Sequence, residues 1–163
     1  MIDAQEHRSR IARYQVALAG RGLEGALLLA GVDLLYLTGT RQNAALFVPA
    51  EGAPVLLVRK SLVRARAEAA VEDVRPFPRS QDLDGALGAR GRIGVAFEVV
   101  PAATLEWWRR QLPRAELVDG GGILREQRSV KSASELALMR EGGRRLSAGL
   151  AEIPTFLRPG LRG

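Results

Sequence analysis

Short apolar runs alternate with amphipathic stretches along the first 120 residues, and this pattern predicts strands and helices that follow one another. Residues 3–19 repeat apolar side chains at helical spacing and end at two glycines, as an amphipathic helix does. Five runs have the length and composition of strands, and the first is apolar throughout, as in a strand covered on both faces. The five runs are 25–30, 44–49, 54–59, 92–98 and 115–119.

Two of these runs are predicted to form a hairpin. Residues 44–49 and 54–59 flank the four residues AEGA, and a short connection with a glycine is typical of such a turn. Residues 73–77 carry a proline and are followed by another, which restricts them to the edge or the end of a sheet. Helices are expected over 31–40, 60–71, 80–88 and 101–112. The alternation indicates an α/β fold in which helices flank a mixed β-sheet.

The stretch DGGGILREQR, residues 119–128, interrupts this alternation. Its three glycines precede charged sequence with no clear period, which is typical of an irregular connection. We therefore predict a domain boundary here, with one domain over 1–127 and a separate linker and helix over 128–163.

The segment after the boundary has strong helix signals. Ser132 and Glu135 have the spacing of a capping box, so a helix should begin at Ala133. Pro154 is expected to end this helix, and Pro159-Gly160 to form a turn. One helical face gathers apolar residues at steps of three and four. These residues are Leu136, Met139, Gly143, Leu146 and Leu150.

Composition excludes several classes of protein. Hydrophobic residues make up 47% of the chain and charged residues 26%, as in ordinary globular domains. The absence of cysteine excludes disulfides and thiolate metal sites. A single histidine, His7, argues against an imidazole metal cluster. No apolar run reaches the roughly 20 residues that span a bilayer, and the N-terminus lacks a secretory signal, so we expect a cytoplasmic protein without membrane contact.

The net charge of +6 does not indicate nucleic-acid binding. Seven basic and three acidic residues lie from Arg128 onward, which leaves 17 basic and 15 acidic residues in the rest of the chain. The excess is therefore concentrated in the last segment, which lacks the interleaved aromatic residues of a base-stacking surface. We expect no nucleic-acid partner.

No complete catalytic or nucleotide motif is present. The glycines of 88–94 do not have dinucleotide-fingerprint spacing, and those of 120–122 are not followed by the lysine of a P-loop. The closely spaced carboxylates at 72–73 and 82–84 lack a neighbouring histidine, so we interpret them as solvated or as helix-terminal residues. Trp107 and Trp108 point about 100° apart on a helix, so one is predicted to pack on the sheet while the other is partly exposed.

The order of segments resembles the creatinase/prolidase/aminopeptidase P family. The resemblance rests on GALLLAGVDLLYLTGT, on PVLLV, on RIGVAFE and on LREQRSVKSASELALMREGGRRL, and it covers nearly the whole chain. Its most specific pieces are the YLTG of 36–39 and the R-x-V-K-S-x-x-E run of 128–135. The chain departs from the family at Asp33, where an asparagine is common.

This resemblance implies a non-catalytic N-terminal domain of a metal-dependent Xaa-Pro peptidase. It implies that the domain forms a homodimer and walls the substrate site, with Tyr36 and Arg41 nearest to that role. Arg128, Lys131, Ser132 and Glu135 would join the domains and open the first helix of the catalytic domain. That second domain is the expected partner of Leu136, Met139, Leu146 and Leu150. It would hold two divalent metal ions (Mn, Co or Zn) on two Asp, one His and two Glu that lie beyond residue 163.

Two other functions remain open at this stage. A standalone protein-binding or scaffolding domain would pack the apolar face of its last helix within the chain. A small nucleotide-binding α/β protein would bind a nucleotide and gain thermal stability from it. By itself the chain should not hydrolyse peptides, because it lacks a ligand set that could activate a metal-bound water.

Overall fold

The computed structural model describes residues 2–157 and residue 160, and the chain divides into two compact units. Unit 1 is Met1–Gln127 and contains the sheet with its covering helices. Unit 2 is Arg128–Gly163 and contains the long last helix.

Unit 1 is built on a six-stranded mixed sheet with the strand order β4-β3-β2-β1-β5-β6. β1 pairs antiparallel with β2, and β2 with β3, which confirms the predicted hairpin, while the other neighbours are parallel. β4 lies at one edge, as its prolines predict. The strands are β1 (Gly25–Leu28), β2 (Ala44–Pro49), β3 (Val55–Val58), β4 (Asp73–Pro76), β5 (Gly91–Val95) and β6 (Ala115–Asp119).

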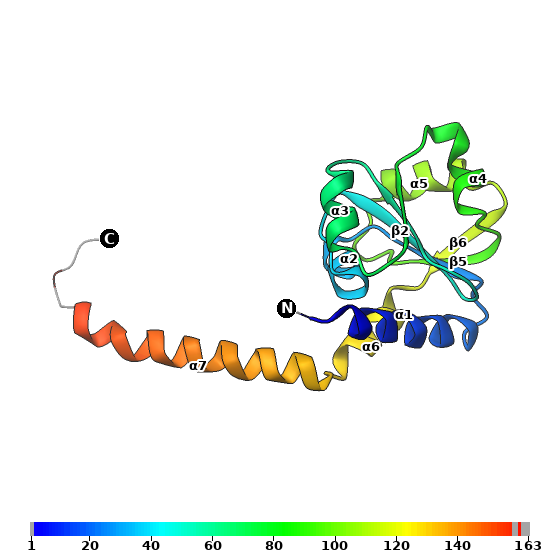
Figure 1. Ribbon diagram of the computed structural model, residues 1–163. Helices are drawn as coiled ribbons and strands as arrows, with labels where there is room; N and C mark the ends of the chain where they lie inside the picture. The colour runs from blue at the N-terminus through cyan, green and yellow to red at the C-terminus, as the bar shows by residue number, and fades with distance from the viewer. Residues whose placement is uncertain (1, 158–159, 161–163) are drawn as a thin grey trace. The chain divides into compact units, whose positions relative to one another are not determined.

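Both faces of the sheet are buried, because alternate residues of each central strand enter different cores. Along β2, Leu46 and Val48 join one apolar cluster, whereas Phe47 joins the other. The first cluster is covered by α1 (Ala4–Ala19), α2 (Gly31–Thr38), α3 (Leu62–Glu68) and α6 (Gly121–Ser129). The second is covered by α4 (Leu83–Leu87) and α5 (Ala102–Gln111), with the short η1 (Ser80–Asp82) before α4. Figure 1 shows α1 and α6 on one side of the sheet and α5 on the other.

The predicted elements of unit 1 are confirmed apart from one segment. The helices over 3–19, 31–40, 60–71, 80–88 and 101–112 form as shorter elements inside those ranges. The tryptophan pair also divides as predicted. Trp108 is buried in the second cluster, and Trp107 is half-buried against it.

The prediction of irregular chain over 119–128 is wrong, because Gly121–Ser129 forms the helix α6. Its Ile123 and Leu124 are buried in the first cluster. The glycines before them serve close contact rather than flexibility. A Cβ on Gly120 would lie 2.8 Å from the Gly94 Cα, and one on Gly121 would lie 2.2 Å from a Glu98 carboxylate oxygen. Packing therefore demands glycine at Gly120, where the neighbour is backbone, although sequence composition indicates a loose connection.

Unit 2 consists mainly of α7 (Ala133–Phe156), which begins at the predicted residue. The prediction that Pro154 ends the helix is wrong, since α7 continues to Phe156. Pro154 cannot donate a backbone hydrogen bond, yet the Leu157 N–H still donates to the Ile153 carbonyl, 2.9 Å from N to O. Of the predicted turn, Gly160 lies in a turn conformation, and Pro159 lies outside the described residues.

Candidate functional site

The Tyr36–Gly39 segment forms the last turn of α2 and its cap. Gly39 adopts a left-handed conformation with φ 86°, and its N–H donates to the Leu35 carbonyl at 3.0 Å. A Cβ at this position would lie 3.1 Å from the Glu68 carbonyl oxygen and 3.2 Å from His7 Nε2. Gly39 is therefore required twice, by its backbone conformation and by the close approach of two other elements.

The Tyr36 carbonyl is a meeting point for two side chains of α1. His7 Nδ1 and Arg10 Nη1 each lie 3.0 Å from this oxygen. Both side chains are buried, with 6% of His7 and 1% of Arg10 exposed. Since a carbonyl only accepts, His7 Nδ1 carries the proton and Nε2 is the unprotonated nitrogen of the neutral ring. The end of α2 is thus held by a histidine and an arginine that are one helical turn apart.

The buried charge of Arg10 is matched by contacts with Glu6 and Tyr36. Its Nε donates to Glu6 Oε1 at 3.1 Å, its Nη1 donates to the Tyr36 carbonyl, and its guanidinium carbon lies 4.2 Å from the centre of the Tyr36 ring. Gln127 of α6 also donates to the Arg10 carbonyl at 2.9 Å. A cation this deep is stable only when such contacts replace water. Arg10 therefore connects α1, α2 and α6.

Burial and charge affect the ionisation of neighbouring groups. The pKa of His7 is lowered mainly by burial and also by the positive charge of Arg10, so the ring is neutral at pH 7. The pKa of the Tyr14 hydroxyl is raised by burial and by the negative charge of Asp33. Asp33 itself is buried in the first turn of α2, where the helix dipole favours a carboxylate.

The loop after Gly39 is tied to α3 through Glu68. Thr40 Oγ1 donates to Glu68 Oε2 at 2.7 Å, and Arg64 Nε donates to Glu68 Oε1 at 2.5 Å. The hydrogen bond from Arg64, followed by that from Thr40, lowers the pKa of Glu68. The bond to Thr40 fixes the start of the loop that carries Arg41.

The two residues that the resemblance puts nearest to a substrate differ in exposure. The Tyr36 side chain is 8% exposed and belongs to the first apolar cluster, beneath Arg10. Arg41 is exposed, and its side chain forms no ion pair or hydrogen bond within residues 2–157. Of the pair, Arg41 is the side chain presented to solvent.

Sequence reasoning missed His7 and Arg10. His7 lies in a stretch that looks solvated, yet it is buried. A signal was present, because His7 precedes Ile11, Tyr14 and Leu18 at steps of four, three and four along the buried face of α1. Arg10 gave no comparable signal, since one arginine among many is usually exposed.

The segment between the units forms local caps. Ser132 Oγ accepts from the Glu135 N–H at 3.2 Å, and Glu135 Oε2 accepts from the Ser132 N–H at 2.8 Å, which confirms the capping box. Lys131 Nζ donates to the carbonyls of Arg128 and Ser129. The sequence from Arg128 to Glu135 thus ends α6 and starts α7 by short-range bonds.

The predicted apolar face of α7 is exposed. Leu136 is 38% exposed, Met139 58%, Leu146 65% and Leu150 55%, and no residue of α7 is buried. Within the described residues, no group of three or more histidine, aspartate or glutamate side chains could hold a metal ion. A search of the same residues finds no helix that is both long enough and apolar enough to cross a membrane.

Comparison with known proteins agrees with this architecture. Residues 10–130 match the family described as the creatinase/prolidase N-terminal domain. A curated relative from Mycobacterium tuberculosis (strain ATCC 25618 / H37Rv), "Probable dipeptidase PepE", is 32% identical over 98% of this chain and 46% of its own length. The chain thus spans about half the length of the curated relatives it matches.

Solved structures share the fold. Dipeptidase PepE from Mycobacterium ulcerans is 27% identical, with a TM-score of 0.78 over 98% of this chain and 46% of that one. The N-terminal domain of the cytoplasmic peptidase PepQ from M. tuberculosis H37Rv is 22% identical, with a TM-score of 0.61 over 72% of this chain and 97% of that one. The fold is the α/β fold of a domain that occurs in such peptidases. The chain belongs to the creatinase/prolidase N-terminal domain family.

Proposed function

We propose that this chain is the N-terminal domain of a metal-dependent Xaa-Pro peptidase of the prolidase or aminopeptidase P type. In this proposal it forms a homodimer in the cytoplasm and walls the substrate site of a catalytic domain. The observation that carries the proposal is α7, a capped helix of 24 residues with an exposed apolar face. Such a face is normally covered in the working protein.

The comparisons support the same proposal. The curated relatives named PepE are peptidases by name and about twice as long as this chain. In our proposal Leu136, Met139, Leu146 and Leu150 pack inside a catalytic domain that follows. Arg128, Lys131, Ser132 and Glu135 form the connection whose caps fix where α7 begins.

Arg41 is our candidate for contact with a substrate. It is exposed on a loop that Thr40 and Glu68 hold in place, and a guanidinium pairs well with a peptide carboxylate. Tyr36 does not contact the substrate but positions this loop, since its carbonyl and ring hold the α1 side chains that fix the end of α2. In this arrangement Arg41 narrows the entrance of the site and Tyr36 sets its position.

The chemistry of the reaction would lie outside this chain. We expect two divalent ions (Mn, Co or Zn) in the catalytic domain, where they would lower the pKa of a bound water and polarise the scissile carbonyl. The part proposed for residues 1–163 is to bind, orient and enclose the substrate.

The first test is the intact mass of the native gene product. A mass of roughly twice the 17.6 kDa of this chain, or somewhat more, fits a two-domain peptidase. Purified native protein should then cleave an Xaa-Pro dipeptide after addition of Mn²⁺, Co²⁺ or Zn²⁺, and a chelator should stop it. A native mass near 17.6 kDa would overturn the proposal and favour a standalone protein-binding domain.

A matched pair of variants tests Arg41 in the native enzyme. Arg41→Ala should raise KM about tenfold with little change in kcat, because a charge-assisted hydrogen bond to the substrate is lost. Arg13→Ala is the control, since Arg13 is also exposed but lies on α1. Equal KM values for the two variants would remove Arg41 from the site.

A further inference from the structure

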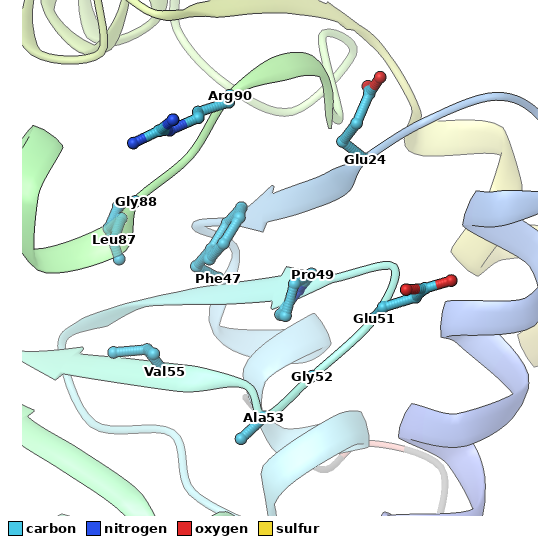
Figure 2. Close-up of a pocket in the computed structure, with 10 residues that line it drawn as sticks. All are labelled: Glu24, Phe47, Pro49, Glu51, Gly52, Ala53, Val55, Leu87, Gly88 and Arg90. Atoms are coloured by element: carbon cyan, nitrogen blue, oxygen red, sulfur yellow. The ribbon is translucent and has the colours of Figure 1, made fainter.

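A hollow of about 310 Å³ opens on unit 1 at the end of the sheet where β1 begins and β2 ends. This volume is at the lower end of the range for small-molecule sites. Figure 2 shows the hollow between the β2–β3 hairpin and the chain that joins α4 to β5. Its lining includes Glu24, Phe47, Pro49, Val55, Leu87 and Arg90.

Glycines shape the floor and the wall of this hollow. A Cβ on Gly25 would lie 2.9 Å from the Val48 carbonyl oxygen and 3.0 Å from the Phe47 ring, so the ring rests directly on the backbone of β1. Gly88 caps α4 in a left-handed conformation with φ 60°, and nothing lies within 4 Å of its Cβ position. The floor of the hollow is therefore the Phe47 ring, which is held against β1, and the space beside Gly88 in its wall is unfilled.

One carboxylate is held at the rim. The Arg92 N–H donates to Glu24 Oε2 at 2.6 Å. Gly91 makes this possible, because a Cβ there would lie 2.6 Å from the Glu24 carboxyl carbon. Glu24 Oε1 makes no hydrogen bond within residues 2–157 and is available to a ligand.

One guanidinium lies across from this carboxylate. Arg90 is exposed and forms no ion pair within the described part of the chain. Figure 2 shows Arg90 and Glu24 on opposite sides of Phe47, whereas Glu51 points away from the hollow. The rim thus offers one positive and one negative group over an apolar floor.

We propose that this hollow binds a small zwitterion with an apolar side chain, namely an apolar amino acid or a short apolar peptide with both ends free. Its carboxylate pairs with Arg90, its ammonium pairs with Glu24 Oε1, and its side chain lies on Phe47, Pro49 and Leu87. For a simple anion the attraction of Arg90 is offset by Glu24, and for a simple cation the attraction of Glu24 is offset by Arg90. The zwitterion satisfies both charges and covers the ring.

Binding can be measured on the ¹⁵N-labelled 163-residue chain by amide chemical shifts. The probes are the dipeptide Ala-Leu, its N-acetylated form, its C-terminal amide and free leucine. Ala-Leu should shift amides in 47–55 and 88–92, and each blocked form should bind about tenfold more weakly because one charged contact is lost. The ratio of the affinities for Ala-Leu and for leucine shows whether the hollow prefers a peptide or an amino acid.

Two rim variants assign the charges. Arg90→Gln should bind Ala-Leu and its amide equally, and Glu24→Gln should do the same for Ala-Leu and its acetylated form. Glu24→Gln keeps an oxygen that can accept from the Arg92 N–H. Arg110→Gln, an exposed arginine on α5, is the control and should bind like the original chain.

Three results would each overturn this proposal. The first is equal affinity for free and blocked dipeptides, and the second is a set of shifts outside the hollow. The third is no shift at about 20 mM probe, where even a millimolar site would be filled. Dispersed amide spectra of every variant exclude unfolding as the cause of a lost response.

Discussion

Two amphipathic helices of this chain, α1 and α7, begin in the same way and differ in what covers them. Each has an acceptor at its N-cap, Asp3 for α1 and Ser132 for α7. α1 buries five side chains, including His7 and Arg10, against the sheet and its neighbours. α7 is longer by half, yet it buries none. Local signals therefore start a helix whether or not its apolar face has a partner.

This difference between α1 and α7 separates two kinds of sequence feature. Some fix where a helix begins, and others indicate that the helix contacts another part of a protein. N-caps act within a few residues, so they work equally well in both helices. Burial depends on residues far away in the sequence, and among the described residues α1 is buried in this way whereas α7 is not. An amphipathic stripe thus indicates that the helix packs against a partner, which can lie in the same unit or outside it.

The largest expected contrast comes from the same substitution in the two units. Leu46→Ala in β2 should lower the free energy of unfolding of unit 1 by about 3–4 kcal/mol, because it leaves a cavity at a fully buried position. Leu146→Ala in α7 should change it by less than about 0.5 kcal/mol, since that side chain is exposed. Urea unfolding followed by the fluorescence of Trp107 and Trp108 measures both.

Similar losses for the two leucine variants would contradict the comparison. They would mean that the face of α7 is covered in solution, for instance by a second copy of the chain. Sedimentation of the unmodified chain over a range of concentrations separates that cause from a change in unit 1.

A glycine pair should give effects of opposite sign. Gly39→Ala is expected to destabilise unit 1 by about 2–3 kcal/mol, because a left-handed residue gains a Cβ against Glu68 and His7. Gly142→Ala should stabilise α7 by about 0.5–1 kcal/mol, because nothing lies within 4 Å of its Cβ position and alanine favours helix. Thermal unfolding reports the first, and slower hydrogen exchange of α7 amides reports the second. A neutral Gly39→Ala would show that the end of α2 is loosely held.

The smallest expected effect is a pH dependence that belongs to unit 1 alone. Because the pKa of His7 is lowered in the fold, the neutral ring stabilises the native state above pH 6.5, and this contribution is lost as the pH falls below that value. His7→Gln should therefore lose less stability than the original chain between about pH 7.5 and about pH 5.5. The measurement is the urea midpoint at both values. Equal losses would exclude His7 as the titrating group.

Much of the fold could be predicted because it depends on short-range patterns. The strands alternate into two cores, so their runs are apolar on both faces and stand out. The AEGA turn, the Gly39 stop and the Ser132 cap each act within a few residues. The candidate contact Arg41 came from the resemblance, and its exposure is an observation of the structure.

The features that escaped prediction depend on contacts between distant segments. α6 was expected to be irregular, because its glycines look like a linker until Gly94 and Glu98 are seen against them. Arg10 was missed because contacts from α2 and α6, far away in the sequence, help to bury it. The hollow was missed for the same reason, since Glu24 and Arg90 come to line one hollow only when β1 and β5 pair.

The position of β4 and β6 at the two margins of the sheet bears on how the protein behaves at high concentration. An open strand can recruit a strand from another molecule and start a fibre or a precipitate. β4 ends in the exposed residues Arg75 and Pro76, and β6 carries the exposed carboxylates Glu116 and Asp119. The charged side chains of both strands and the missing N–H of Pro76 oppose the addition of another strand. In concentrated solutions the molecules should therefore associate first through the apolar side of α7. Replacing one of its apolar residues by a charged residue would be the simplest way to reduce this association.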